Sequence, residues 1–155
     1  MGLLCVPLVS LDGCPLSTVR ELRYLGVFLV SGNTMRCSLD HNKRGFFKAS
    51  NAIFSHVLHV ANDNVVIHLL KVMCMPILLY GLEACPLTRS QLSSLDFVVV
   101  RCAMKIFRTI NRQVVLECLN FFGLSLPSGV IANRTAKLKV KLLHTNNTFI
   151  RRCLL

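Results

Sequence analysis

Residues 87–110 decide the fold, and they read LTRSQLSSLDFVVVRCAMKIFRTI. Thr88 and Gln91 have the spacing of a capping box, in which each side chain bonds the other residue's backbone N–H at a helix start. Leu87 and Leu92 flank this pair at the spacing of a hydrophobic staple. Apolar residues then recur every three or four positions, which predicts a helix that runs to about residue 109. Its buried face is predicted to hold Leu92, Leu95, Val99, Cys102, Ile106 and Ile110.

The opposite side of the same helix is basic. Arg101, Lys105 and Arg108 are separated by four and three residues, which places them in one narrow sector. Arg112 extends this series if the helix continues that far. No acidic residue stands four positions from these cations, so no intrahelical ion pair neutralises them. They either form a solvated surface or contact a phosphate backbone, and the lack of neutralising acids favours phosphate contact.

A second amphipathic pattern begins after Asn42. Its apolar face holds Phe46, Ser50, Ile53, Val57 and Ala61, and its polar face holds Arg44, Lys48, Asn51 and Ser55. The pattern predicts another helix. Its cations are either solvated or a second ridge that binds a nucleic-acid backbone.

A third helix is predicted to begin at residues 62–64, where Asn and Asp offer caps. Its apolar positions are Val65, Leu69 and Met73. Pro76 should end or kink this helix near Met75, because proline lacks an N–H and clashes with the preceding turn. Residues 77–85 then form an apolar connector.

Two more helices are predicted towards the end of the chain. Asn111 can cap a short helix that ends at residues 121–123, and Leu126-Pro127-Ser128 separates it from a last helix. This last helix carries the cations Arg134, Lys137, Lys139 and Lys141.

The first 30 residues have the short apolar runs of β-strands instead of helical spacing. One run at residues 3–9 leads to the turn Leu11-Asp12-Gly13, and another at residues 24–30 ends at Ser31-Gly32-Asn33. The predicted fold is therefore mainly α. A short N-terminal β-hairpin in residues 1–36 is followed by a bundle of four or five helices in residues 37–155.

The chain is strongly basic. Its 155 residues include 18 Lys and Arg against 7 Asp and Glu, which gives a formal charge of +11. This excess favours a polyanionic partner, with nucleic acid as the first candidate and an anionic membrane surface as the second. Because 53% of the residues are apolar and the mean hydropathy is +0.55, a protein-interaction module with an exposed apolar face is a further alternative.

Eight cysteines are spread along the chain without any Cys-x-x-Cys pair. No signal peptide accompanies them, so they are predicted to be reduced thiols and not a disulfide framework. This favours an intracellular, reducing location, with nucleus and cytoplasm both open. A membrane location is not expected, because the longest uncharged apolar stretch, residues 72–82, is too short to span a bilayer.

Five segments stand in a distinctive order along the chain. They are Tyr24-Leu25-Gly26, then FFKASNAI at residues 46–53, CMPILLYGLEAC at residues 74–85, MKIFRT at residues 104–109, and residues 114–123. This order resembles the region after the catalytic centre in non-LTR (LINE-type) retrotransposon reverse transcriptases. The resemblance covers nearly the whole chain. It implies that residues 1–36 are a remnant of the polymerase palm and that the helices form a thumb-like region, which holds primer and template.

The resemblance implies contacts with RNA, DNA or an RNA–DNA hybrid, and with the missing palm and fingers of a parent polymerase. Phosphate contacts position a protein without specifying a sequence, so binding should be tolerant of sequence. The predicted nucleic-acid-binding residues are the cations Arg44, Lys48, Arg101, Lys105, Arg108, Arg112, Arg134, Lys137 and Lys141.

Catalysis by this chain alone is not expected. Reverse transcription is a two-metal phosphoryl transfer that needs clustered carboxylates, whereas the seven acids here are scattered and include no Asp-Asp pair. The resemblance places the family's catalytic aspartates before residue 1, so Mg²⁺ is expected only in the intact parent and no cofactor is expected here. His56 and His59 are spaced like metal ligands but lack a third ligand, so no metal site is predicted.

Three further residues have alternative interpretations. Tyr24 and Tyr80 are interpreted as packed aromatics, because their neighbours are apolar, and not as platforms on which bases stack. Glu83 is either a buried partner for an arginine or a carboxylate at a helix end, and the second interpretation is favoured.

Overall fold

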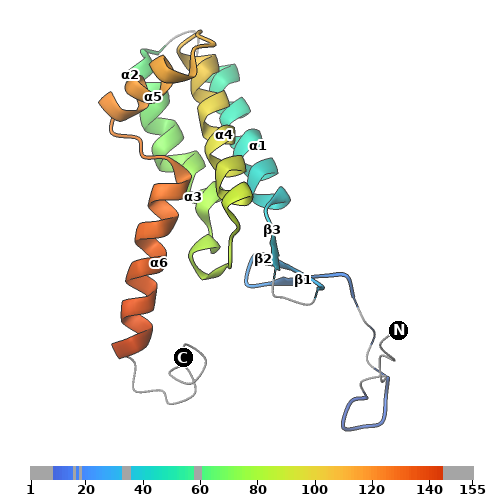
Figure 1. Ribbon diagram of the computed structural model, residues 1–155. Helices are drawn as coiled ribbons and strands as arrows, with labels where there is room; N and C mark the ends of the chain where they lie inside the picture. The colour runs from blue at the N-terminus through green and yellow to red at the C-terminus, as the bar shows by residue number, and fades with distance from the viewer. Residues whose placement is uncertain (1–8, 16, 18, 33–35, 58–60, 145–155) are drawn as a thin grey trace.

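The computed structural model describes residues 9–15, 17, 19–32, 36–57 and 61–144. In these residues a small antiparallel sheet is followed by a helical bundle, which confirms the mainly α fold with an N-terminal hairpin (Figure 1). The sheet has the strand order β1–β2–β3, with β1 at Glu21–Tyr24, β2 at Val27–Val30 and β3 at Arg36–Ser38.

A two-residue turn, Leu25-Gly26, joins β1 to β2. Tyr24 pairs with Val27 across it, and the two turn residues have φ values of 47° and 82°. Two positive φ values are the signature of a type I′ turn, which matches the twist of the flanking strands. The single strand predicted over residues 24–30 is therefore wrong, because Gly26 adopts the left-handed backbone without strain and lets the chain reverse inside the apolar run.

The earlier predicted turn is present. The Gly13 N–H donates to the Ser10 carbonyl at 2.9 Å, and the Ser10 N–H donates to the Cys14 carbonyl at 2.8 Å. Gly13 has a φ of 76°, as such a reversal requires. Most of the strand predicted over residues 3–9 lies outside the described residues.

The first helix, α1 (Asp40–Val57), is the amphipathic helix predicted after Asn42. Phe46, Ser50 and Ile53 are buried on its core side. The predicted polar face is exposed at Arg44, Lys48, Asn51 and Ser55. Phe54 is also buried, although the pattern did not predict it.

Three segments continue one another as a single helix: α2 (Asp63–Leu69), η1 (Leu70–Cys74) and α3 (Met75–Leu79). Of the two outcomes predicted for Pro76, an end of the helix near Met75 is therefore wrong, whereas a local distortion of the helix is present. The backbone widens into a π-helical turn before Pro76, in which the Met75 N–H bonds the Leu70 carbonyl five residues back. The wider turn relieves the clash between a proline ring and the carbonyl four residues earlier.

The apolar face predicted for this helix is also wrong. Val65 and Met73 are about half exposed. The core side carries Val66, Ile67, Leu70, Cys74, Leu78 and Leu79 instead. The predicted connector contains the end of α3 and a short 3₁₀ turn, η2 (Leu82–Ala84).

The helix α4 (Arg89–Ile106) starts with the predicted capping box. The Gln91 N–H donates to Thr88 Oγ1 at 3.2 Å, and the Thr88 N–H donates to Gln91 Oε1 at 2.9 Å. The helix ends before the predicted residue 109. Of its predicted core residues, Ile110 is 93% exposed and Leu92 is half-buried, whereas Leu95, Val99, Cys102 and Ile106 are buried.

The last two helices begin and end close to the predicted positions. Asn111 caps α5 (Arg112–Phe121), because its Oδ1 accepts from the Gln113 N–H at 2.9 Å. Pro127 stands at the start of α6 (Pro127–His144). Asp96 of α4 accepts from the Ser128 N–H at 2.8 Å, so it satisfies one of the free N–H groups at the start of α6.

The centre of the bundle is α4, against which α1, α2, α5 and α6 all pack. Three successive residues in its middle, Val98, Val99 and Val100, are buried, which requires neighbours on most sides of the helix. Figure 1 shows the sheet at the lower end of α1, and α6 leading away from the rest of the bundle. Within the described residues, none of the helices has the length and apolar character needed to cross a membrane.

Candidate nucleic-acid interface

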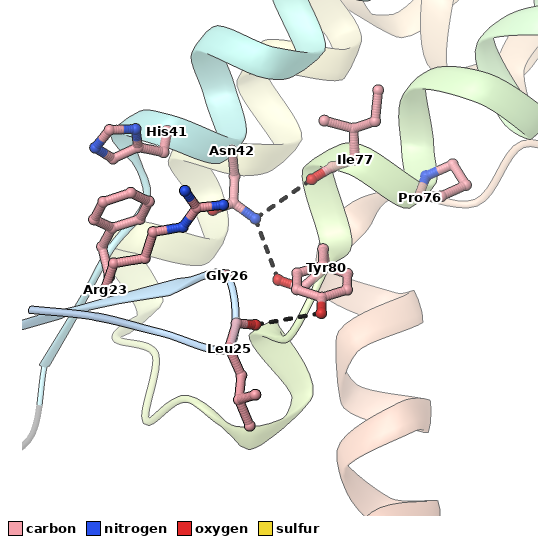
Figure 2. Close-up of a pocket in the computed structure, with 9 residues that line it drawn as sticks. Arg23, Leu25, Gly26, His41, Asn42, Pro76, Ile77 and Tyr80 are labelled. Carbon is pink, nitrogen blue, oxygen red and sulfur yellow. Dashed lines mark hydrogen bonds between the residues drawn. The ribbon is translucent and has the colours of Figure 1, made fainter.

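An open pocket lies where the β1–β2 hairpin meets the start of α1 and the end of α3 (Figure 2). We call it the junction pocket, and its volume is about 740 Å³. None of its lining residues belongs to the predicted set of cations. The lining consists of Arg23, Leu25, Gly26, Phe28, His41, Asn42, Pro76, Ile77 and Tyr80.

Two polar side chains fix the walls of the junction pocket. The Asn42 amide donates to the Ile77, Leu78 and Tyr80 carbonyls at 3.4, 3.2 and 3.3 Å, so it caps the end of α3, where carbonyls lack helical partners. The Tyr80 hydroxyl donates to the Leu25 carbonyl at 3.3 Å and ties the hairpin turn to α3 (Figure 2). A Cβ on residue 26 would lie 2.9 Å from Tyr80 Cε1, so this close approach favours glycine there.

A cationic and aromatic cluster forms one side of the junction pocket. The Phe28 and His41 rings stack with centroids 3.5 Å apart and an interplanar angle of 6°. The Arg23 guanidinium carbon lies 5.8 Å from the Phe28 centroid. Guanidinium and imidazole N–H groups bond phosphate oxygens, and flat rings stack on bases, so the cluster suits a nucleotide.

Sequence reasoning missed the two cationic or titratable members of this cluster. Arg23 directly precedes Tyr24-Leu25-Gly26, and His41 directly precedes Asn42, after which the basic helix was predicted to begin. Their places next to these segments are the signals in the sequence that could have pointed to the two residues. Neither indicates the stacking with Phe28, which depends on how the hairpin docks on α1.

The helices α1 and α4 run parallel, and their contacts share one register. Near their N-terminal ends, Lys43 Nζ donates to Ser94 Oγ at 2.6 Å. Near their C-terminal ends, Lys105 Nζ lies 4.7 Å from the centroid of the Phe54 ring. Both pairs are 51 residues apart in the sequence, so the contact line keeps the same offset along the two helices.

Four of the predicted cations share the outer side of this helix pair: Arg44, Lys48, Arg101 and Lys105. Each residue turns an α-helix by about 100°. From the contact line, Arg44 and Lys48 therefore turn away from the core, and Arg101 turns to the same side from α4. All four side chains are exposed, and we call this surface the α1–α4 face. Within the described parts of the chain, no carboxylate forms an ion pair with Arg44, Lys48 or Arg101.

Arg108 does not continue the series of cations on α4, contrary to prediction. It lies beyond Ile106 with a φ of 51°, and the Thr109 N–H closes the helix end by donating to the Met104 carbonyl at 3.2 Å. This is a Schellman ending, in which the residue with positive φ is usually glycine. Arg112 is displaced as well, because it is the first residue of α5. The predicted series is interrupted after its first two members.

The cations of α6 form a separate set. Arg134, Lys137 and Lys141 are exposed. The helix packs against α4 and η2, and it leads away from α1 in Figure 1. The structure therefore divides the predicted cations among distinct surfaces.

Tyr24 and Tyr80 are mostly exposed, contrary to the prediction that they are packed aromatics, although one edge of the Tyr80 ring lies against Gly26. Their side chains are 62% and 58% exposed. The apolar neighbour Leu25, which favoured packing, is itself 76% exposed at the tip of the hairpin. Both rings offer surfaces on which a base can stack.

Several acidic side chains have structural roles within the fold. Glu117 accepts a hydrogen bond from Gln113 Nε2 at 3.1 Å on its own helix, and Asp96 caps α6. Glu83 belongs to η2, where its Oε2 is buried without a hydrogen-bond partner. Of the residues that the structure describes, no group of three or more His, Cys, Asp or Glu is placed to hold a metal ion.

Three thiols are shielded by packing and not activated. Burial raises the pKa of Cys74 to about 11 and the pKa of Cys102 to about 12. Burial, followed by a hydrogen bond with the Cys37 side chain, raises the pKa of Cys85 to about 12. These thiols are protonated at neutral pH and are poor nucleophiles.

Comparisons with known proteins identify no relative: no protein-family model, curated protein or solved structure matches the chain. The candidate interface is therefore defined by its own geometry. It consists of the junction pocket and the α1–α4 face, which both begin at the first turns of α1.

Proposed function

We propose that this chain binds nucleic acid through the phosphate backbone, using the α1–α4 face and the junction pocket. The observation that carries the proposal is the gathering of four exposed cations from two helices on one surface. Three of them have no carboxylate partner in the described residues. Double-stranded nucleic acid carries about one negative charge per 1.7 Å of its axis, so a surface of this kind gains affinity by releasing condensed counterions.

The junction pocket extends the same surface with a different chemistry. Arg23 and His41 add N–H donors, and the stacked Phe28 and His41 rings add flat surfaces. A strand held by its phosphates on the α1–α4 face can place an end or an unpaired nucleotide in this pocket. Such contacts depend little on base identity.

The order of segments that resembles non-LTR retrotransposon reverse transcriptases supports the same function. On this proposal the chain acts as a thumb-like grip on RNA, DNA or an RNA–DNA hybrid, next to a palm and fingers that it does not itself contain. It binds without polymerising, because its scattered acids offer no pair of carboxylates for two metal ions. Magnesium belongs to the intact parent polymerase.

The test removes the four cations of the α1–α4 face together. The variant carries Arg44→Gln, Lys48→Gln, Arg101→Gln and Lys105→Gln. Each lost phosphate contact lowers the slope of log affinity against log salt by about 0.7 to 0.9, so the slope should fall by about three. Fluorescence anisotropy with a labelled duplex and a labelled hybrid, between about 50 and 200 mM salt, measures this change.

A matched control removes the same charge elsewhere. The control variant carries Arg20→Gln, Arg36→Gln, Arg89→Gln and Lys139→Gln. These four cations are exposed and do not belong to the α1–α4 face. This control should lower the salt slope much less than the variant of the α1–α4 face, while circular dichroism should show equal helix content for both. If both variants lowered the salt slope equally, binding would depend on net charge alone. An unchanged salt slope in the variant of the α1–α4 face would exclude this face as the interface.

A further inference from the structure

A second pocket lies on the other face of the β1–β2 hairpin. Side chains alternate between the two faces of a strand. Arg23 and Phe28 accordingly line the junction pocket, whereas Tyr24, Val27 and Leu29 line the second one. The two pockets share a wall made of Leu25, Pro76 and Tyr80. The hairpin tip therefore separates the junction pocket, which contains a cationic side chain on its hairpin wall, from a pocket that is lined mainly by apolar and aromatic residues.

We call the second one the Glu83 pocket. Its volume is about 570 Å³, within the range of about 300 to 1,000 Å³ that is usual for small-molecule sites. Most of its wall is apolar or aromatic, and its ionisable members are few. The lining beyond the strand residues and the shared wall consists of Gly81, Glu83, Ala84, Cys85 and Arg134.

One oxygen of the Glu83 carboxylate receives no hydrogen bond from the part of the protein that the structure describes. This oxygen, Oε2, is shielded from solvent and has no hydrogen-bond partner, so Arg134 does not bond this oxygen although it lines the same pocket. The residue cannot move away, because η2 fixes its backbone and its carbonyl accepts from Thr135 Oγ1 at 3.1 Å. A buried carboxylate oxygen without a donor is costly, and the last side-chain torsion has a broad minimum, so the carboxylate can rotate to meet a donor that enters the pocket. Glu83 also lines a neighbouring cavity beside α6.

A carboxylate is an acceptor only, so its ligand must present donors side by side. Among the bases, guanine places N1–H next to its N2 amino group on one edge. Adenine and cytosine place a ring acceptor beside their amino group, and uracil flanks its single N–H with two carbonyls. Those acceptors would face the carboxylate and repel it. A flat ring also suits the apolar wall and the exposed rings of Tyr24 and Tyr80.

We propose that the Glu83 pocket takes an unpaired guanine base of the bound strand, with N1–H and the N2 amino group donating to the Glu83 carboxylate. Arg134 at the pocket lies on α6 with Lys137 one turn further on, and these cations contact the phosphates that flank the base. The proposal rests on the proposed function. It adds recognition of one base to a grip that is otherwise indifferent to sequence.

The experiment measures affinity for duplexes that carry one bulged nucleotide, either guanine, inosine or adenine, beside a fully paired duplex. A good bidentate pair discriminates by about tenfold, so the guanine bulge should bind about tenfold more tightly than the adenine bulge. Inosine keeps N1–H and lacks the N2 amino group, so it should fall between them. Glu83→Gln should abolish the preference for guanine and favour adenine instead, because its amide oxygen accepts from the N6 amino group of adenine and its N–H donates to the adjacent ring nitrogen.

Two controls separate the pocket from the backbone grip. Glu117→Gln removes an exposed carboxylate on α5 and should leave the preference for guanine intact. The fully paired duplex should bind the Glu83→Gln variant as tightly as the parent chain. Equal affinity for all bulges, or a guanine preference that survives Glu83→Gln, would overturn the assignment.

The pocket can also be tested without any phosphate contact. Saturation-transfer NMR should show stronger transfer to guanosine than to adenosine, and Glu83→Gln should remove this preference for guanosine or reverse it. If the chain fails to bind duplexes but passes this test, the proposed function fails and the pocket stands. If it binds duplexes but guanosine and adenosine behave alike, only the pocket assignment fails.

Discussion

The helical bundle and the β1–β2 hairpin are held in place in different ways. In the bundle, large apolar side chains such as Leu70, Leu78 and Leu95 are fully buried. In the hairpin, every residue of β1 is exposed and none of β2 is buried. The hairpin tip is attached by the hydrogen bond from Tyr80 to Leu25 and by the close approach of Gly26 to the same ring. The bundle therefore carries most of the free energy of folding, and the hairpin leaves its side chains available to both pockets.

The largest expected effect on stability comes from replacing one leucine in each region. Leu95 is fully buried, so Leu95→Ala should lower the free energy of unfolding by about 2 to 5 kcal/mol. Leu22 in β1 is 54% exposed, so Leu22→Ala should change it by less than about 0.5 kcal/mol. Urea unfolding followed by circular dichroism measures both. Comparable losses would show that the hairpin belongs to the same cooperative core.

The bundle was largely predictable from the sequence because its signals are local. The capping box of Thr88 and Gln91, the cap at Asn111 and the start of α6 at Pro127 each depend on residues within one turn of a helix. The errors come from longer-range packing or from backbone adjustment. The helix continues past Pro76 because a π-helical turn accommodates the ring, and α4 stops early because Arg108 takes up a left-handed backbone.

The candidate site was predictable only in part. Helical spacing predicts that Arg44 lies beside Lys48 and that Arg101 lies beside Lys105. That both pairs gather on one face depends on the register between α1 and α4. Neither pocket could be predicted, because each combines the hairpin with residues some 50 positions or more away in the sequence, as in the bond from Tyr80 to Leu25. Such contacts leave no periodic pattern in the chain.

An alkaline titration compares thiols in the two parts of the molecule. Burial raises the pKa of Cys102 from 9.0 to about 12. Between these values the folded chain keeps the proton while the unfolded chain loses it, so stability is intact below pH 9 and falls as the pH rises. The expected slope is about 1.4 kcal/mol per pH unit for this thiol.

Urea unfolding at a series of pH values in the presence of a reductant measures this slope. Cys102→Ala should unfold more easily at neutral pH but should lose stability less steeply above pH 9. The matched control is Cys14→Ala, because Cys14 is exposed in the N-terminal turn and outside the bundle. A slope that is the same in Cys102→Ala and in the parent chain would contradict the assignment to the bundle thiol.

The smallest effects come from the two residues other than glycine that have positive φ among those described, Leu25 in the hairpin and Arg108 at the end of α4. A left-handed backbone costs a side chain about 1 kcal/mol, and Asn or Gly tolerates it better. Arg108→Gly should therefore raise the free energy of global unfolding by about 0.5 to 1 kcal/mol, because α4 belongs to the cooperative core.

Leu25→Asn gives the hairpin an Asn-Gly turn, the favoured pair for type I′. If the hairpin opens independently of the bundle, this gain should slow amide hydrogen exchange in β1 and β2 by about two- to fivefold and leave global unfolding unchanged. Should Leu25→Asn raise the global free energy as much as Arg108→Gly does, the hairpin unfolds together with the bundle, and the proposed separation between a stable core and a binding tip is wrong.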